Sequence, residues 1–144
     1  MKFWHEIEER DYLKINKIKM EIKEDLLYTN DHEWVRIEGD EAIVGITDYA
    51  QSELGEIVFV DVPAIGESIQ QFNVFGSVEA VKTVADLNMP MSGTVKEFND
   101  RLDSEPELVN NDPYGDGWII KISLDDPREV ANLLTPEQYK EICQ

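Results

Sequence analysis

The sequence predicts a mainly β protein, a small sandwich or barrel of short antiparallel strands. Runs of β-branched and aromatic residues recur from Trp34 onward, glycine and proline separate these runs, and little of the chain has the period of a long helix. Short strands with frequent turn signals are typical of sandwiches and barrels. The 144 residues, 42% of them hydrophobic, suffice for one domain with an ordinary core.

The first predicted elements are a hairpin and a short helix. The strands are residues 33–37 (EWVRI) and 42–46 (AIVGI), and the turn between them places Gly39 at its tight position. Residues 47–55 (TDYAQSELG) have an N-cap at Thr47 or Asp48 and end at Gly55, which predicts about two helical turns.

The middle of the chain predicts strands joined by turns. A strand over residues 56–62 stops before Pro63, and residues 68–72 form a shorter one. Residues 73–90 (NVFGSVEAVKTVADLNMP) are rich in β-forming residues that are interrupted at 80–83, and a Ser-Gly turn opens a further strand ending at Phe98.

The last third begins with a polar stretch, residues 99–117, in which residues 105–110 (EPELVN) form one helical turn. A strand follows over residues 118–124 (WIIKISL). Two C-terminal helices are predicted, over residues 126–134 and 135–143. Each starts with an N-cap, Asp126 or Thr135, followed by proline at the first helical position.

Residues 1–19 differ from the rest and are predicted to be an N-terminal appendage, disordered or weakly helical, because their apolar residues follow no regular period. Residues 20–144 are predicted to form a single domain. The appendage holds five basic and four acidic side chains, so residues 20–144 hold the other 8 basic and 27 acidic ones.

Composition excludes several functions. The net charge of −18 and the lack of any basic cluster argue against nucleic-acid binding. No apolar run is long enough to span a membrane, and the N-terminus lacks the apolar centre of a signal peptide, so we expect a cytoplasmic protein. Two histidines and one cysteine offer no metal site, and no nucleophile or phosphate-binding motif occurs, so we expect no catalytic residues.

One lysine stands out. Lys82 lies in SVEAVKTVAD, where valines flank a predicted turn, and no other basic residue occurs between Arg36 and Lys96. A lysine at the tip of a tight turn, held on an apolar base, exposes its amine to a modifying enzyme. The alternative is an ordinary solvated lysine.

Around this lysine the sequence resembles the glycine cleavage H-protein family of lipoyl carriers. The matching motifs are HEWVRIEGDEAIVGITDYAQSELGEIVFVDVP, FGSVEAVKTVADLNMPMSGTV, PELVNNDPYGDGWIIKI and LTPEQYKEIC, from about Leu26 to Cys143. The resemblance implies a barrel-sandwich hybrid fold of the lipoyl- and biotinyl-carrier type, with two small antiparallel sheets and short helices. It also implies a non-catalytic monomer that carries lipoic acid on Lys82.

The resemblance further implies partners and contacts. A glycine decarboxylase that uses pyridoxal phosphate loads an aminomethyl group onto the arm, a tetrahydrofolate-dependent aminomethyltransferase removes it, and dihydrolipoamide dehydrogenase reoxidises the arm. A lipoate ligase or lipoyltransferase attaches the lipoyl group. Glu33 and Asp86 match the family's acids that hold the loaded arm in a cleft, whereas Tyr49 stands where the family commonly has histidine.

Other readings of the sequence remain open. Within the same class, the chain could relay lipoate to other proteins instead of serving glycine. From another class, it could be an unmodified acidic scaffold that recruits a basic partner. A biotin carrier is disfavoured because Val81 and Thr83, not methionines, flank the lysine. A lipoyl domain of a 2-oxo acid dehydrogenase is disfavoured by PYGDGW and the C-terminal helices.

Overall fold

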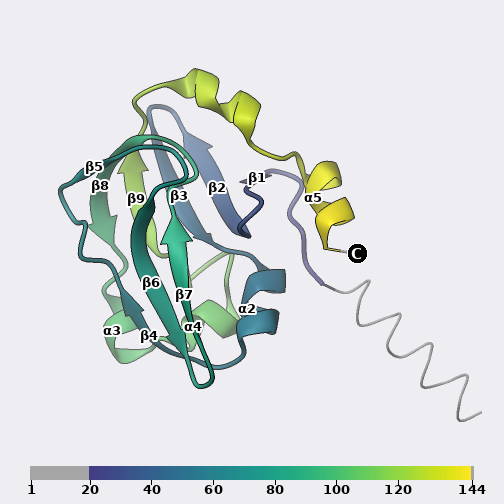
Figure 1. Cartoon of the computed structure of the whole chain (residues 1–144), viewed down its shortest axis with the longest axis vertical. Coiled ribbons are helices and arrows are strands. Elements are labelled where there is room, and N and C mark those ends of the chain that lie inside the picture. The colour runs from purple at the N-terminus through teal and green to yellow at the C-terminus, as the bar shows by residue number, and fades with distance from the viewer. Residues whose placement is uncertain (1–19, 144) are drawn as a thin grey trace, which may run out of the picture.

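The protein is built from two antiparallel sheets with short helices around them, as Figure 1 shows. The computed structural model describes residues 20–143, so the predicted appendage, residues 1–19, lies outside them. The larger sheet has the strand order β1-β2-β3-β9-β8-β5 and the smaller has the order β4-β6-β7. The strands are β1 Leu27–Tyr28, β2 Glu33–Glu38, β3 Glu41–Ile46, β4 Ile57–Asp61, β5 Ser68–Ile69, β6 Val74–Ala80, β7 Val84–Asn88, β8 Gly93–Phe98 and β9 Ile120–Ser123.

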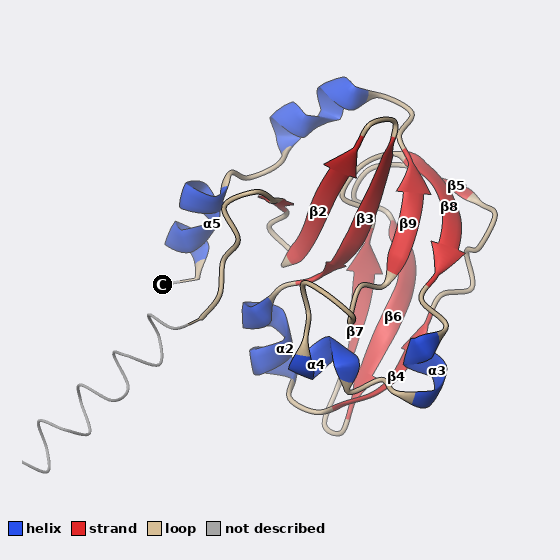
Figure 2. Ribbon diagram, turned by 180° about the vertical axis from the view of Figure 1, so that it is seen from behind, coloured by secondary structure: helices blue, strands red, loops and turns tan. Residues whose placement is uncertain are grey.

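The two sheets pack face to face. Figure 1 shows β6 and β7 in front of the larger sheet, and Figure 2 shows β2, β3 and β9 from the other side. Val44 and Ile122 from the larger sheet and Val78 and Leu87 from the smaller belong to one buried cluster. In β9, buried Ile120 and Ile122 alternate with half-buried Lys121 and Ser123, because successive side chains of a strand point to opposite faces. The expected mainly β fold with two small sheets is therefore confirmed.

The helices are short and lie at the edges of the sheets. They are α2 Asp48–Leu54, α3 Arg101–Ser104, α4 Leu108–Asn111, a 3-10 helix Pro127–Asn132 and α5 Pro136–Ile142. Thr47 caps α2, and Thr135 with Gln138 forms a capping box at α5. The segment predicted as a helix over residues 126–134 is this 3-10 helix, whose N-cap Asp126 also binds Arg128. Every helix within residues 20–143 is too short or too polar to cross a bilayer.

The β6–β7 hairpin determines where the predicted site lies. Three residues, Val81 to Thr83, connect the two strands, so Lys82 occupies the tip. In Figure 1 this hairpin runs along the front of the molecule and its tip projects at the lower end, near α2 and α4. The hairpin belongs to a sheet that packs on the core, and its tip therefore has a firm base.

Candidate functional site

Lys82 is exposed at the tip of the hairpin. The backbone amide of Ala80 donates to the carbonyl oxygen of Thr83 at 2.7 Å, which closes the turn. The backbone amide of Val81 donates to the carbonyl oxygen of Glu56 at 3.1 Å, which ties the tip to the residue before β4. These two hydrogen bonds fix the backbone on both sides of Lys82 and leave its side chain in solvent.

Lys82 is also unusual in lacking an ion pair. Within residues 20–143 the other lysines each lie 3.5 Å or less from a carboxylate oxygen: Lys23, Lys96, Lys121 and Lys140. Lys82 makes no such pair, and no hydrogen bond, with any residue of that range. Its amine is therefore available to an incoming reagent without the loss of an existing contact.

The open face of the small sheet extends from this tip. Strand pairing sets Phe59, Glu79 and Val84 side by side nearest the tip, and Asp61, Ser77 and Asp86 side by side one step further along. The first row is apolar at both ends. The second carries a carboxylate at both ends, with a hydroxyl between them.

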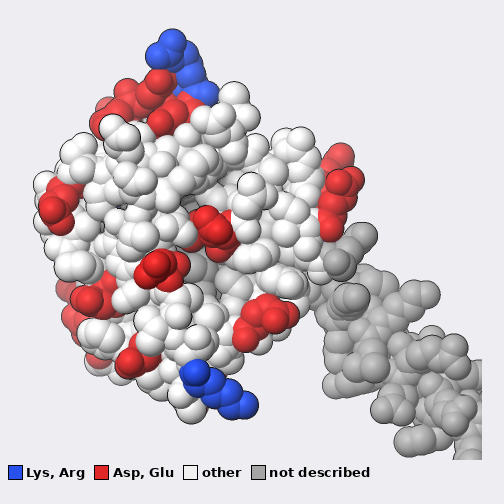
Figure 3. Space-filling model, viewed as in Figure 1, with Lys and Arg blue, Asp and Glu red and all other residues white. Residues whose placement is uncertain are grey.

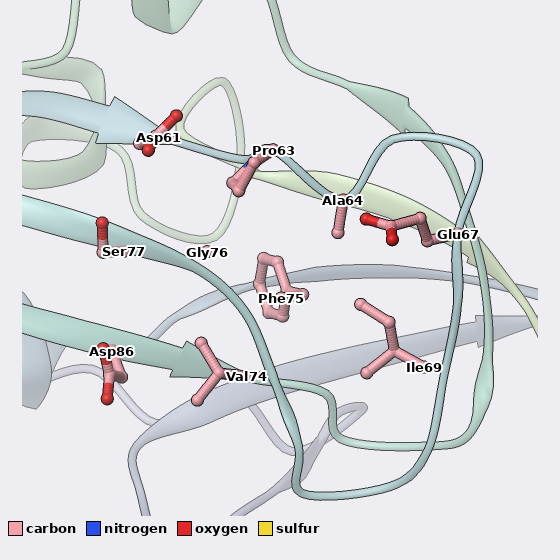
Figure 4. Close-up of a pocket in the computed structure, with 10 residues that line it drawn as sticks. All are labelled: Asp61, Pro63, Ala64, Glu67, Ile69, Val74, Phe75, Gly76, Ser77 and Asp86. Carbon is pink, nitrogen blue, oxygen red and sulfur yellow. The ribbon is translucent and has the colours of Figure 1, made fainter.

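This second row borders a groove of about 450 Å³, shown in Figure 4. Asp61, Ser77 and Asp86 come from the three neighbouring strands, and Pro63 and Glu67 come from the segment after β4. The remaining lining is mostly apolar: Ala64, Ile69, Val74, Phe75 and Gly76. The groove thus combines an apolar wall with acidic side chains, and Figure 4 shows Glu67 at the side away from Asp61 and Asp86.

Glu33 takes a different position from Asp86. Its side chain is 1% exposed, and its carboxyl oxygens accept hydrogen bonds from the Thr29 hydroxyl at 2.5 Å and the Asn88 backbone amide at 3.2 Å. Burial raises the pKa of Glu33 to about 8. Glu33 therefore lies under the far end of β7, whereas Asp86 stands exposed on that strand's open face.

Tyr49 is half-buried on α2, beside His32. The two rings are 4.7 Å apart, and Nδ1 of His32 is 2.7 Å from the hydroxyl of Tyr139 on α5. Burial lowers the pKa of His32. Tyr49 is thus connected through His32 to the C-terminal helix.

The sequence did not indicate Asp61 and Ser77 as neighbours of Asp86. Their proximity depends on the register of β4 and β6, which no local pattern reveals. Residues 20–143 contain no group of three histidine, cysteine, aspartate or glutamate side chains that could hold a metal ion.

Figure 3 shows the charges on the face that carries the small sheet. Among residues 20–143, separate acidic groups are spread across it, and basic groups are visible only at its upper and lower ends. The lower one lies where Figure 1 places the hairpin tip. A cationic ligand or a basic protein surface is favoured along this face.

Comparisons with known proteins agree with these features. The family model described as Glycine cleavage H-protein matches residues 26–144. The chain is 51% identical over 123 residues to the glycine cleavage system H protein of Bacteroides thetaiotaomicron, covering 85% of this chain and 98% of the relative. It is 54% identical over 119 residues to that of Rubrobacter xylanophilus, covering 83% and 92%.

A solved structure is similar as well. The crystal structure of a glycine cleavage system H protein from Mycobacterium marinum superposes with a TM-score of 0.76 at 39% sequence identity. The match covers 83% of this chain and 97% of that one. Sequence and fold therefore point to the same family.

Proposed function

The chain belongs to the glycine cleavage H-protein family, and from this premise we propose that Lys82 is the residue that bears its lipoyl group. The family role is that of a non-catalytic lipoyl carrier in the glycine cleavage system. When bound, the lipoyl group supplies a disulfide that is reduced as it accepts an aminomethyl group.

The observation that supports Lys82 most directly is its availability. It is exposed at a three-residue hairpin tip and has no ion pair with any residue of 20–143, whereas the other four lysines there are paired. An amine must lose its proton before it attacks an acyl group, and a carboxylate partner would stabilise the protonated form. An unpaired lysine on a fixed turn therefore suits amide formation.

We also propose that Asp86 meets the cationic end of the loaded arm. Asp86 lies four residues beyond Lys82, at most about 13 Å along the chain, because Val84 to Asp86 are extended while Lys82 and Thr83 belong to the turn. A lysine extended by a lipoyl chain spans about eleven bonds, roughly the same distance. The Asp86 carboxylate is exposed and stands beside Ser77, so it can pair with an ammonium group at that point.

Glu33 and Tyr49 are the other proposed residues of the arm cleft, and Glu33, being 1% exposed, supports the cleft from beneath β7 and does not line its open face. Glu33 bonds to Asn88, two residues beyond Asp86 on the same strand. Because the pKa of Glu33 is about 8, its protonated form predominates at pH 7, and it contributes hydrogen bonding before it contributes charge. Tyr49, on α2, supplies a hydroxyl that donates or accepts one hydrogen bond.

Membership of the family implies interaction with the other components of the glycine cleavage system. We propose that these are the pyridoxal-phosphate decarboxylase, the tetrahydrofolate-dependent aminomethyltransferase and dihydrolipoamide dehydrogenase, with a lipoate ligase or lipoyltransferase acting earlier. A cytoplasmic location and a monomeric state are also proposed, and cell fractionation and light scattering would test them.

The direct test is enzymatic lipoylation of the purified full chain. The chain, Lys82→Arg and Lys121→Arg are incubated with a lipoate ligase, lipoate and ATP, and then analysed by intact mass and peptide mapping. We expect one lipoyl addition at Lys82 in the wild type and in Lys121→Arg, and none in Lys82→Arg. An unmodified wild type with a normal melting curve, or addition at another lysine, would refute the assignment and favour the unmodified scaffold.

A further inference from the structure

We propose that four exposed apolar side chains beside Lys82 form the docking surface for the enzyme that acylates this lysine. The inference rests on the proposed attachment of the lipoyl group to Lys82. We call this surface the tip patch, and its members are Val58, Phe59, Val81 and Val84, which are 43%, 50%, 65% and 60% exposed.

Strand pairing brings these side chains together. Phe59 on β4 and Val84 on β7 both pair with Glu79 on β6, so they flank it within one row. Val81 precedes Lys82, and its backbone amide bonds to Glu56, two residues before Val58. The tip patch therefore extends from the lysine across the end of the small sheet.

A β-bulge enlarges the tip patch. The register between β4 and β6 shifts between Ile57 and Phe59. In a regular strand, neighbouring side chains point to opposite faces, so Val58 and Phe59 could not both lie on the open side. Here Ile57 and Val60 are buried while Val58 and Phe59 are both exposed. Bulges of this kind redirect side chains next to functional sites.

The reaction at Lys82 identifies the occupant. The Lys82 amine, after losing a proton, attacks the carbonyl carbon of lipoyl adenylate, which is formed from lipoate and ATP. The new amide bond replaces the bond to phosphate, and AMP leaves with the bonding electrons. The acylating enzyme must therefore bring its active site to the end of the unmodified lysine side chain. At that distance its surface unavoidably meets the residues around the tip.

The decarboxylase, the aminomethyltransferase and the dehydrogenase do not have to approach the hairpin tip so closely, because the finished arm extends about 13 Å from the Lys82 backbone. They act at the end of that arm. The tip patch therefore fits the acylating enzyme better than it fits the enzymes that load or reoxidise the arm.

The acidic side chains around the tip patch indicate which charges the partner surface should carry. Glu56 and Glu79 are exposed beside the tip patch, and the whole chain carries a net charge of −18. A matching surface has an apolar centre bordered by lysine or arginine side chains. The association of the acylating enzyme with this chain should slow as ionic strength rises, because salt screens the attraction between exposed charges.

The test compares tip-patch variants with controls of equal exposure elsewhere. One full-length variant carries Val58→Thr, Phe59→Ser and Val84→Thr. The control carries Ile37→Thr and Ile65→Thr, whose native side chains are 39% and 47% exposed. Ile37 lies on β2 of the larger sheet, and neither residue lines the groove. Threonine keeps β-branching, and melting curves verify that both proteins are folded.

The measured quantity is kcat/KM for lipoylation by a purified lipoate ligase with lipoate and ATP. We expect a loss of about tenfold or more in the tip-patch variant, since a few buried apolar anchors dominate such interfaces, and less than about twofold in the control. Once fully lipoylated by long incubation, the tip-patch variant should be reduced by dihydrolipoamide dehydrogenase with NADH at the wild-type rate.

Two outcomes would overturn the docking inference, and a third would refute the proposed function. Equal lipoylation rates for all three proteins would overturn the docking inference while leaving Lys82 as the attachment site. An equal loss in the dehydrogenase assay would also overturn it, because the tip patch would then serve any arm-using partner. A wild type that accepts no lipoyl group would refute the proposed function itself.

Discussion

The backbone amide of Asn88 donates a hydrogen bond of 3.2 Å to Oε2 of Glu33, and this contact joins the two sheets. Glu33 begins β2 of the larger sheet, and Asn88 ends β7 of the smaller. The other carboxyl oxygen accepts a hydrogen bond from Thr29. A buried carboxyl group therefore lies at the end of the strand whose beginning follows Lys82.

Glu33→Gln is expected to remove a pH dependence of stability. Burial raises the pKa of Glu33 from its ordinary value of 4.5 to about 8. Between these values the folded chain keeps a proton that the unfolded chain has released. The stabilisation from this group is therefore complete below pH 4.5 and decreases as the pH rises towards 8, by at most about 1.4 kcal/mol per pH unit. Glutamine does not titrate.

Urea denaturation at pH 5, 6, 7 and 8 measures this effect. The free energy of unfolding of the wild type should fall relative to that of Glu33→Gln as the pH increases. Glu38→Gln, at the exposed end of the same strand, should follow the wild type. A constant difference between wild type and Glu33→Gln over this range would show that Glu33 titrates below it.

Asp86→Asn is expected to shorten the lifetime of the aminomethyl-loaded carrier. The carboxylate would no longer pair with the ammonium group of the arm, and an exposed pair of this kind corresponds to a change of about fivefold. Mass spectrometry would follow the spontaneous loss of the aminomethyl group from the lipoylated, loaded chain. Asp40→Asn, in the β2–β3 turn, is the matched control, and equal decay of both variants would argue against a role for Asp86.

Most of the strands could be predicted because their patterns are local. The segments EWVRI and AIVGI are rich in β-forming residues and form the paired strands β2 and β3, and Gly39 has φ of 68° in the turn between them. The position of Lys82 in a turn could be predicted equally well, since the β pattern is interrupted around this residue. By contrast, β1 has only two residues, which is too short to show any period.

The acids of the site were less predictable. Glutamate is rarely buried, so the sequence alone gives Glu33 an exposed position, whereas the fold surrounds it with Thr29 and Asn88. The bulge at Val58 was also hidden, because IVFV is apolar throughout and shows no register. Features that depend on pairing between distant segments are set by the tertiary structure.

Tyr139→Phe is expected to destabilise the fold by about 1–3 kcal/mol. The hydroxyl of Tyr139 is 2.6 Å from Oγ1 of Thr47 and 2.7 Å from Nδ1 of His32, while its ring stacks on Tyr28. Phenylalanine keeps the stacking and removes the hydroxyl, so two half-buried or buried polar groups lose a partner. Urea denaturation gives the change in the free energy of unfolding. A change below about 0.3 kcal/mol would mean that water replaces the hydroxyl.

Gly93→Ala is expected to destabilise the protein more than Gly39→Ala. A Cβ atom at Gly93 would overlap the carbonyl oxygen of Ser123, next to the β8–β9 pair, and backbone atoms move only with the sheet. The cost should be about 3 kcal/mol, or roughly 10 °C in Tm. A Cβ atom at Gly39 meets nothing within 4 Å, so alanine there carries only the strain of a positive φ, about 1–2 kcal/mol. Thermal melting of both variants gives the order, and a larger loss for Gly39→Ala would show that backbone conformation, not close packing of β8 on β9, sets the requirement for glycine in this fold.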